Sequence, residues 1–452
     1  MNKTTVLIVF FSLIFFSLSV FVYLNVSSQN PHRDSDSIRY EGKADLFHKT
    51  NRFFPPCTEN NEPVAPQPIG YAFFIGIVHK IFGQKDWPII WLQILLTLLS
   101  GFFVFFAAKH LFGKTIAITS FAFFVTNIGY LVFAQFILAE CLTVLFLTWY
   151  FERFCYFIKT KSIVSLMLSG LILGMSTLVK PAGLYFIYPS AIFAIFVLYK
   201  TPKRLLYIPF LLSMFFLPIK SLQMYNAKTY GHTNFTNVGT FNLYVWFWGK
   251  AEANAKPKKE FDSYDKNLKE FRKQKLDILY KNGKPNWKRL SDRFWFAFKK
   301  NPFPFVFCWL KEMSKTAFGL FTTNLKILVG SHQKGSEAFS FFLTKGPMHS
   351  RIHQYVSNGA ESLTVVLLGY LEILWSLFRL ILFAVGLLYL TRKNQWLIIS
   401  FFLSYIGYLT LVSGFDGCAR YRVMFEFAIL IFSALGFSNL FLQKKVKNVS
   451  KM

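Results

Sequence analysis

The chain has 452 residues, of which 54% are hydrophobic and only 16% are charged, against roughly 25% charged in ordinary soluble domains. A soluble protein of this length cannot bury so much apolar surface in one core, and the 57 phenylalanines suit lipid-facing helices better. The composition therefore predicts a polytopic membrane protein. The net charge of +28 would also suit nucleic-acid binding, but Lys and Arg gather in the cytoplasmic loops of membrane proteins, so we expect no nucleic-acid partner.

A membrane-spanning helix needs about 20 predominantly apolar residues, and about ten such segments follow one another along the chain. They lie near residues 4–26, 88–109, 115–133, 136–157, 163–180, 182–199, 204–222, 362–390, 396–413 and 422–442. The first is longer than the apolar run of about 7–15 residues in a signal peptide, and no small-residue cleavage site follows it, so we expect a membrane anchor. The predicted fold is an all-α bundle of about ten transmembrane helices with an outward-facing loop layer.

The basic residues of the short connections predict the orientation of this bundle. If the N-terminus is inside, alternation also places the basic stretches inside. These are Lys109–Lys114, Lys159–Lys161, Lys200–Arg204, Arg392–Lys393 and the tail Lys444–Lys451. Because Lys and Arg are enriched on the cytoplasmic side, both termini are predicted to be cytoplasmic. The two long polar regions, 27–87 and 223–361, then face outward.

The chain divides into three expected parts. Residues 1–222 hold seven helices and the first outer loop, 27–87. Residues 223–361 are too long for a plain connection, so this outer loop should have structure of its own. Residues 362–452 hold the last three helices and a basic cytoplasmic tail.

The long outer loop contains two kinds of predicted helix. Residues 250–300 are rich in Lys with interleaved acids, which indicates a solvated helix. Residues 302–322 are apolar but include Lys311, Glu312 and Lys315, which a spanning helix would bury at high cost. We therefore predict an amphipathic helix in the membrane interface. Its aromatic residues, which suit that depth, are Phe303, Phe305, Phe307 and Trp309.

The cysteines and histidines predict no metal site. The cysteines, none of which forms a CxxC pair, are Cys57, Cys141, Cys155, Cys308 and Cys418. Cys57, Cys308 and Cys418 could share an oxidising compartment, so one disulfide among them stays open. His349 and His353 are four residues apart but lack the companion acid of a zinc motif.

The first outer loop carries the most informative pattern. Asp36, Tyr40 and Ala44 are spaced to share one face of a helix, and an apolar run ending at Phe82-Gly83 follows Pro68-Ile-Gly70-Tyr71. By themselves the acids of this stretch, Asp34, Asp36 and Glu41, also fit a solvated loop.

This order of residues resembles the first outer loop of the GT-C membrane glycosyltransferases. The resemblance is to their bacterial branch, which is related to protein O-mannosyltransferases and lipid A aminoarabinose transferases. In that family the acidic residue after the first helix is the catalytic base, and Asp36 matches it. Many members have a second carboxylate directly beside it, where this chain has Ser37. If the segment is helical, Asp34 is expected on a different face.

Two further positions match this resemblance along the chain. Glu140, near the outer end of the fourth span, corresponds to an acid at the rim of the active cavity. An acid satisfied by a neighbouring helix is the alternative, since a carboxylate at membrane depth needs a partner. Lys180, before Pro181, corresponds to a basic residue that could meet a lipid phosphate, or it is simply a basic helix end.

The last span opens with Arg420-Tyr421-Arg422. The resemblance places an Arg-Tyr pair here, and a guanidinium suits phosphate oxygens. Alternatively Arg422 and Glu426, at i and i+4, neutralise each other. The predicted site consists of catalytic Asp36 and Glu140 with substrate-binding Tyr40, Lys180, Arg420, Tyr421 and Arg422.

In the eighth span, Glu372 and Arg379 are expected to pair with each other inside the bundle.

The resemblance implies a multi-pass protein of the bacterial inner membrane. It would transfer a sugar from a polyprenyl-phosphate donor to a hydroxyl of a glycan, lipid or protein acceptor on the outer face, by inverting displacement. No cofactor is established, although Asp36 with Glu140 could hold a divalent cation. The alternatives are a transporter or flippase of lipid-linked saccharide, which would use similar intramembrane charges, and a polysaccharide polymerase or ligase. The polymerase or ligase would place its essential residues in 223–361.

Overall fold

A computed structural model describes residues 2–442 apart from 27–31, 52–67, 231–232, 234, 237, 256–260, 280–285, 330–346, 358–359 and 361. Throughout these described residues the regular structure is helical and contains no strand, which confirms the all-α fold. Cys57 and the tail 444–451 lie outside them. Cys308 and Cys418 are free thiols.

The first half of the chain contains α1 (Lys3–Leu24), α2 (Ser35–Thr50), α3 (Ile69–Phe82), α4 (Asp86–Phe112), α5 (Lys114–Val125), α6 (Ile128–Phe133), α7 (Glu140–Thr160), α8 (Ile163–Val179), α9 (Ile187–Leu198) and α10 (Tyr207–Tyr230). The long loop contains α11 (Val238–Phe241), α12 (Trp248–Ala255), α13 (Phe261–Leu279), α14 (Trp287–Lys300), α15 (Phe303–Phe318), α16 (Thr322–Leu328) and α17 (Met348–Ser357). The last helices are α18 (Leu363–Arg392), α19 (Trp396–Ser413) and α20 (Ala419–Phe437).

Within the described residues, eight helices are long and apolar enough to cross a membrane. They are α1, α4, α7, α9 with the preceding turn, α10, α18, α19 and α20. The expected span 115–133 is interrupted because the Asn127 side chain accepts the N–H of Gly129, which caps a new helix and leaves α5 with 12 residues. The expected span 163–180 forms α8, which has 17 residues.

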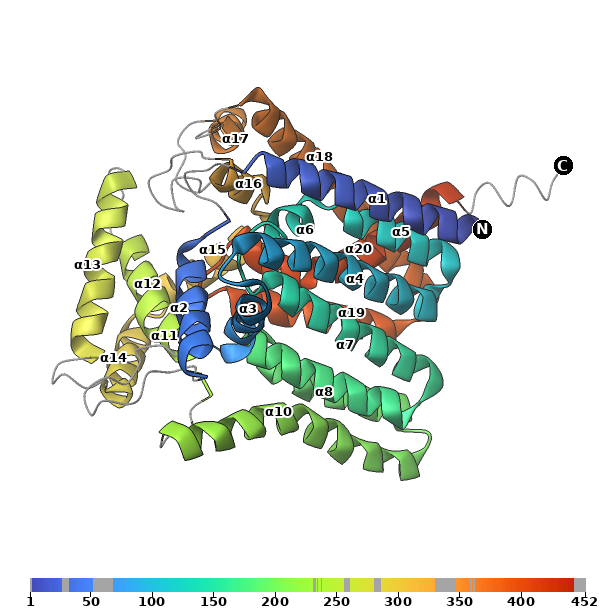
Figure 1. The fold of residues 1–452 in the computed structure, drawn as a ribbon, viewed down its shortest axis with the longest axis horizontal. Helices are drawn as coiled ribbons and strands as arrows, with labels where there is room; N and C mark the ends of the chain where they lie inside the picture. The colour runs from blue at the N-terminus through green and yellow to red at the C-terminus, as the bar shows by residue number, and fades with distance from the viewer. Residues whose placement is uncertain are drawn as a thin grey trace.

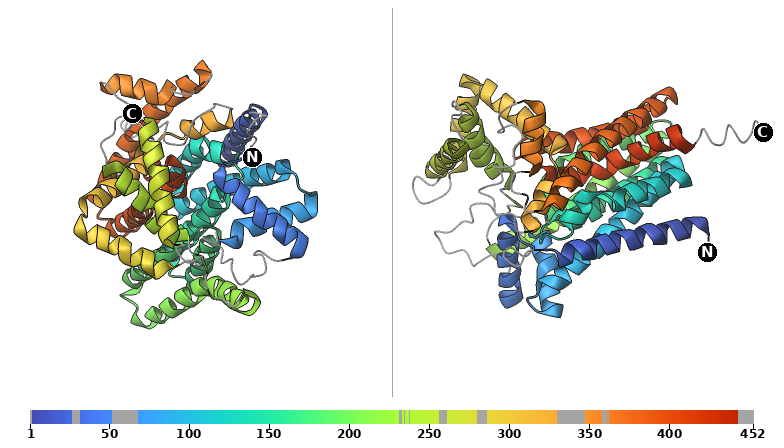
Figure 2. Two further views of the ribbon diagram at one scale, coloured as in Figure 1. Left: turned by 90° about the vertical axis from the view of Figure 1, so that its left-hand side faces the viewer. Right: turned by 90° about the horizontal axis from the view of Figure 1, so that it is seen from above.

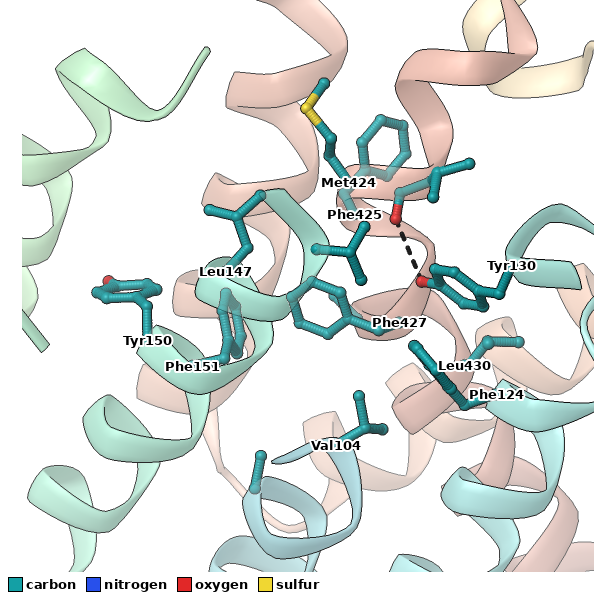
Figure 3. Close-up of a cluster of buried hydrophobic side chains, with 14 of the residues drawn as sticks. Val104, Phe124, Tyr130, Leu147, Tyr150, Phe151, Met424, Phe425, Phe427 and Leu430 are labelled. Atoms are coloured by element: carbon teal, nitrogen blue, oxygen red, sulfur yellow. Dashed lines mark hydrogen bonds between the residues drawn. The ribbon is translucent and has the colours of Figure 1, made fainter. Parts of the chain in front are cut away.

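Helix α20 lies at the centre of the bundle. Of its apolar window 72% is buried inside the protein, against 11% for α1, which lies at the edge (Figure 1). Aromatic and aliphatic side chains from α4, α5, α6 and α7 pack around it, and the Tyr130 hydroxyl donates to the Val423 carbonyl over 3.2 Å (Figure 3). This packing fixes α20, whose first turn carries Arg420.

The α18–α20 crossing depends on glycine. A Cβ on Gly436 would lie 1.9 Å from the Leu382 carbonyl oxygen, and one on Gly386 would lie 2.2 Å from that of Phe432. Small residues at such crossings let membrane helices approach closely. The close approach lets Arg379 of α18 form an ion pair with Glu426 of α20.

The expected pairing of Glu372 with Arg379 is therefore wrong. Arg379 pairs with Glu426. Glu372 instead accepts the backbone N–H groups of Phe321 and Thr322 over 2.7 and 2.8 Å. Glu372 and Arg379 each bind a partner from another element, because helix packing brings that partner closer than a residue two turns away on the same helix.

The described helices of the two polar regions lie toward one end of the bundle. Helices α2, α12, α13 and α14 gather at the end opposite the start of α1 (Figures 1 and 2). The sequence predicted this shared placement of 27–87 and 223–361. Helix α15 forms within the segment expected to be amphipathic, and it lies against α12, α19 and α20.

Candidate functional site

Four helix ends place the predicted site residues at this end of the bundle. Asp36 lies in the first turn of α2, Glu140 is the first residue of α7, and Arg420 lies in the first turn of α20. Acidic side chains are stabilised at helix N-termini by the unpaired backbone N–H groups. The fourth position, Lys180, directly follows α8.

The backbone of Lys180 is extended and not helical, so its side chain does not continue the α8 helix. Pro181 disfavours the helical conformation of the residue before it, and Lys180 is extended at φ −147° and ψ 121°. Its ammonium donates to Glu140 Oε1 over 2.6 Å and lies 4.7 Å from the centroid of the Tyr421 ring. Lys180 is thus brought to Glu140, and the Tyr421 ring lies beside its ammonium.

The guanidinium of Arg420 binds three carboxylates. Nη2 lies 3.0 Å from Asp36 Oδ2, and Nη1 lies 3.2 Å from Asp34 Oδ2. Nε donates to Glu140 Oε1. A planar guanidinium has donors directed to different sides, so one arginine can organise all three acids. Segments far apart in sequence converge on this group.

The acids of the cluster differ in accessibility. The Asp36 side chain is 30% exposed, and the Arg39 guanidinium lies 3.7 Å from it. Glu140 is fully buried, between the cations of Lys180 and Arg420. Of these two predicted catalytic acids, only Asp36 can meet a substrate in this arrangement.

Asp34 belongs to the cluster, contrary to the expectation that it faces elsewhere. That expectation treated residue 34 as helical, but α2 begins at Ser35. The backbone N–H of Asp34 donates to the Ser37 hydroxyl, and the Ser37 N–H donates back to the Asp34 carbonyl, both over 2.9 Å. This turn directs Asp34 and Asp36 to the same guanidinium. Ser37 therefore shapes the loop at the position where many related chains have an acid.

A buried polar layer lies beneath the cluster. Tyr40 is buried edge-on against Tyr71 at 5.0 Å, and burial together with the charge of Glu140 raises its pKa. The Tyr71 hydroxyl donates to Gln93 Oε1 over 2.6 Å, and Gln93 Nε2 donates to the Phe136 carbonyl over 2.7 Å. Gln93 was not among the predicted site residues, although a Gln within an apolar span indicates a buried hydrogen-bond partner.

Arg422 has different partners. It donates over 3.0 and 2.8 Å to the carbonyl oxygens of Ala317 and Gly319. Its Nε lies 3.1 Å from Glu426 Oε2, as the i, i+4 alternative predicted. It is almost completely buried, so the structure separates it from the cluster around Arg420.

No group of three or more His, Cys, Asp and Glu side chains that could hold a metal ion occurs in the described part of the chain. Asp36 and Glu140 are bridged instead by the Arg420 guanidinium.

Two comparisons find known proteins. Residues 66–225 match the family model of the dolichyl-phosphate-mannose-protein mannosyltransferases, a stretch that includes Glu140 and Lys180 but neither Asp36 nor Arg420. No curated protein sequence matches the chain.

The fold resembles that of an archaeal oligosaccharyltransferase. AglB from Archaeoglobus fulgidus, solved with an inhibitory peptide and a dolichol-phosphate, has a TM-score of 0.53 and 13% identity, covering 99% of this chain and 52% of AglB. The apo oligosaccharyltransferase of the same organism has a TM-score of 0.53 and 14% identity, with the same coverage. The chain spans about half the length of those proteins. It is a multi-pass membrane protein with a GT-C fold, and its resemblance to the GT-C membrane glycosyltransferases is confirmed.

Proposed function

We propose that this protein is an integral-membrane glycosyltransferase. It moves a sugar from a polyprenyl-phosphate donor to an acceptor hydroxyl on the outer face of the membrane. The observation that carries the proposal is the charge cluster at one end of the bundle, in which accessible Asp36 pairs with Arg420, and Arg420 shares Glu140 with Lys180. The family match and the dolichol-phosphate held by AglB support a lipid-linked donor.

Asp36 is the general base of this proposal. Its carboxylate takes the proton of the acceptor hydroxyl while that oxygen attacks the anomeric carbon. The bond from the anomeric carbon to the phosphate oxygen breaks, polyprenyl phosphate leaves, and the configuration inverts. The Arg420 contact holds the Asp36 carboxylate in the cluster.

Lys180 and Arg420 stabilise the leaving group in this proposal. Lys180 and Arg420 are both partly exposed and both bind Glu140, which fixes their positions. A fixed cation stabilises the negative charge that develops on the departing phosphate. We assign Glu140 a positioning role because it is fully buried, and we do not place Arg422 at the phosphate because its donors are used elsewhere.

The test compares two aspartates that bind the same guanidinium. Asp36→Asn should lower transfer by about 10²–10⁴-fold, the usual contribution of a general base, whereas Asp34→Asn should retain most activity. Mass analysis of surface glycans from cells with and without the protein identifies the sugar and acceptor for this assay. Full activity of Asp36→Asn in folded protein would contradict the proposal. Assays with Mn²⁺ or a chelator decide whether a divalent ion shared by Asp36 and Glu140 takes part.

A further inference from the structure

We propose that the elbow between α14 and α15, residues 295–310, docks on anionic lipid headgroups at the membrane boundary beside the bundle. This inference is independent of the proposed reaction. It names an interaction surface and its partner, a lipid leaflet rich in anionic headgroups.

Helix α15 has an exposed apolar stripe. Phe303, Val306, Phe307 and Leu310 are all exposed, with Phe303 at 73%. Their i, i+3, i+4, i+7 spacing puts them on one side of the helix. The described residues of the protein leave this stripe uncovered.

Buried ion pairs on the opposite side hold the stripe outward. Glu312 is fully buried and binds the ammonium groups of Lys250 at 3.0 Å and Lys315 at 2.7 Å. Lys311 is buried on the same side, where its ammonium donates to Asn254 Oδ1 over 2.8 Å. Rolling α15 to hide its phenylalanines would expose these pairs and break them. A helix that turns its charges into the protein and its phenylalanines outward suits an apolar surrounding.

The bundle itself fixes the depth of the stripe. The Trp309 indole N–H donates over 3.1 Å to the carbonyl of Leu411, in the last turn of the candidate span α19. A Cβ on Gly417, just before the candidate span α20, would lie 1.8 Å from the Glu312 carbonyl oxygen, so α15 also touches that chain end. Helix α15 therefore lies level with the ends of two spans. Trp is enriched at this boundary between headgroups and acyl chains.

The charge of α14 selects the kind of lipid. Trp295 and Phe296 are exposed, Phe296 at 72%, on the surface that also presents Lys299 and Lys300. Only Asn301 and Pro302 separate these lysines from Phe303. The remaining exposed charges of α14 are Lys288, Asp292 and Arg293. Exposed aromatic residues among cations match an anionic membrane surface, where each Lys or Arg strengthens attachment.

The test measures how deeply the tryptophans of the elbow lie in lipid. The full chain is reconstituted in vesicles of phosphatidylcholine alone or with phosphatidylglycerol, each with acyl chains brominated near the headgroup. The signals of Trp295 and Trp309 are isolated as differences between the wild type and the Trp295→Phe and Trp309→Phe variants. Both should be quenched, and Trp248, which is buried at the start of α12, should not be.

The lipid charge is tested with the double variant Lys299→Gln/Lys300→Gln. Each cation near an anionic surface contributes about five-fold to attachment, so the double variant should weaken docking about 25-fold in phosphatidylglycerol vesicles and leave it unchanged in phosphatidylcholine. High salt should reduce the difference. Absence of quenching at Trp295 and Trp309 overturns docking itself. Equal quenching in both lipids, insensitive to the double variant, overturns the anionic partner.

Discussion

Arg420 organises the candidate site at the scale of single residues. It contacts Asp34, Asp36 and Glu140, which come from two separate parts of the chain, and it lies at the start of the most buried span. One largely buried cation among three acids lowers their mutual repulsion and sets the direction of each carboxylate. The two partly exposed acids, Asp34 and Asp36, are then held where a substrate can reach them.

Replacing Arg420 with lysine tests this organising role. A lysine ammonium is a point charge without the planar fork of arginine, so it cannot direct three carboxylates at once. We expect Arg420→Lys to lower transfer about 10²-fold through misplacement of Asp36, with the larger effect on kcat. Arg422→Lys is the matched control, because Arg422 binds the carbonyl oxygens of Ala317 and Gly319 and not the acids around Arg420. This variant should mainly lower the unfolding temperature. Equal loss of activity in both variants would argue against the assignment.

Glu140 should matter for stability as well as activity. Removing one member of a buried ion pair typically costs about 3–5 kcal/mol because the remaining charge loses its partner. Glu140→Gln leaves Lys180 and Arg420 without their shared acid, and its unfolding temperature in detergent should fall markedly. Asp36→Asn, at a partly exposed position, should change that temperature little. A wild-type unfolding temperature for Glu140→Gln would be inconsistent with the buried pairing.

At the scale of elements, α15 joins α12 to the bundle, with Glu312 bound to Lys250 of α12 and packed against Gly417 before α20. Burial works to raise the pKa of Glu312, but the ammonium groups of Lys250 and Lys315 outweigh it and hold the pKa at about 2, below the ordinary 4.5. The folded state therefore binds this proton less readily than the unfolded state. Its contribution to stability is complete above pH 4.5 and is lost as the pH falls toward 2.

This linkage predicts a pH-dependent difference between two proteins. Glu312→Gln should lower the unfolding temperature at neutral pH, and the gap from the wild type should narrow as the pH falls below about 4.5. Thermal unfolding in detergent across that range measures it. Glu270→Gln, at an exposed position on α13, is the control and should track the wild type throughout. A gap that stays constant down to pH 2 would refute the ion-pair account.

The crossing of α18 and α20 gives a second prediction for elements. Gly436→Val places atoms where the Leu382 carbonyl lies, and overpacking of this kind costs about 1–3 kcal/mol or more. It should also disturb the contact between Arg379 and Glu426. Gly407→Ala on α19 meets no atom within 4 Å and should be neutral or slightly stabilising. Thermal unfolding compares the two, and similar losses would mean that the crossing tolerates side chains.

At the scale of the whole molecule, the charged residues of the Arg420 cluster all lie at one end of the bundle. Transfer from a lipid-linked donor therefore needs no sealed compartment, whereas transport does. We expect purified protein in detergent micelles to transfer sugar to an added acceptor, with Asp36→Asn as the inactive control. Lipid-linked saccharide that moves across sealed vesicles without being consumed would favour a transporter instead.

Much of this arrangement could be predicted from local sequence. The apolar segments indicated the eight candidate spans but also two segments, 115–133 and 163–180, whose helices are shorter, and the first outer loop indicated Asp36 and Tyr40. Arg420 and Arg422 were both predicted to bind substrate, although residues two apart on a helix do not face the same way, and the structure gives them different partners. The position of Asp34 was not readable, because it depends on a turn closed by Ser37 just before the helix.

The sequence by itself determined the class of protein, the helices and the residue types available for chemistry, because apolar length and local spacing are properties of short segments. Only the tertiary structure decided which charges meet. Glu140 is paired with Lys180 and Arg420, and Arg379 with Glu426, because helix ends and glycine crossings from distant segments pack together. Each charge in an apolar bundle must take the partner that packing brings nearest, and no short segment contains that information.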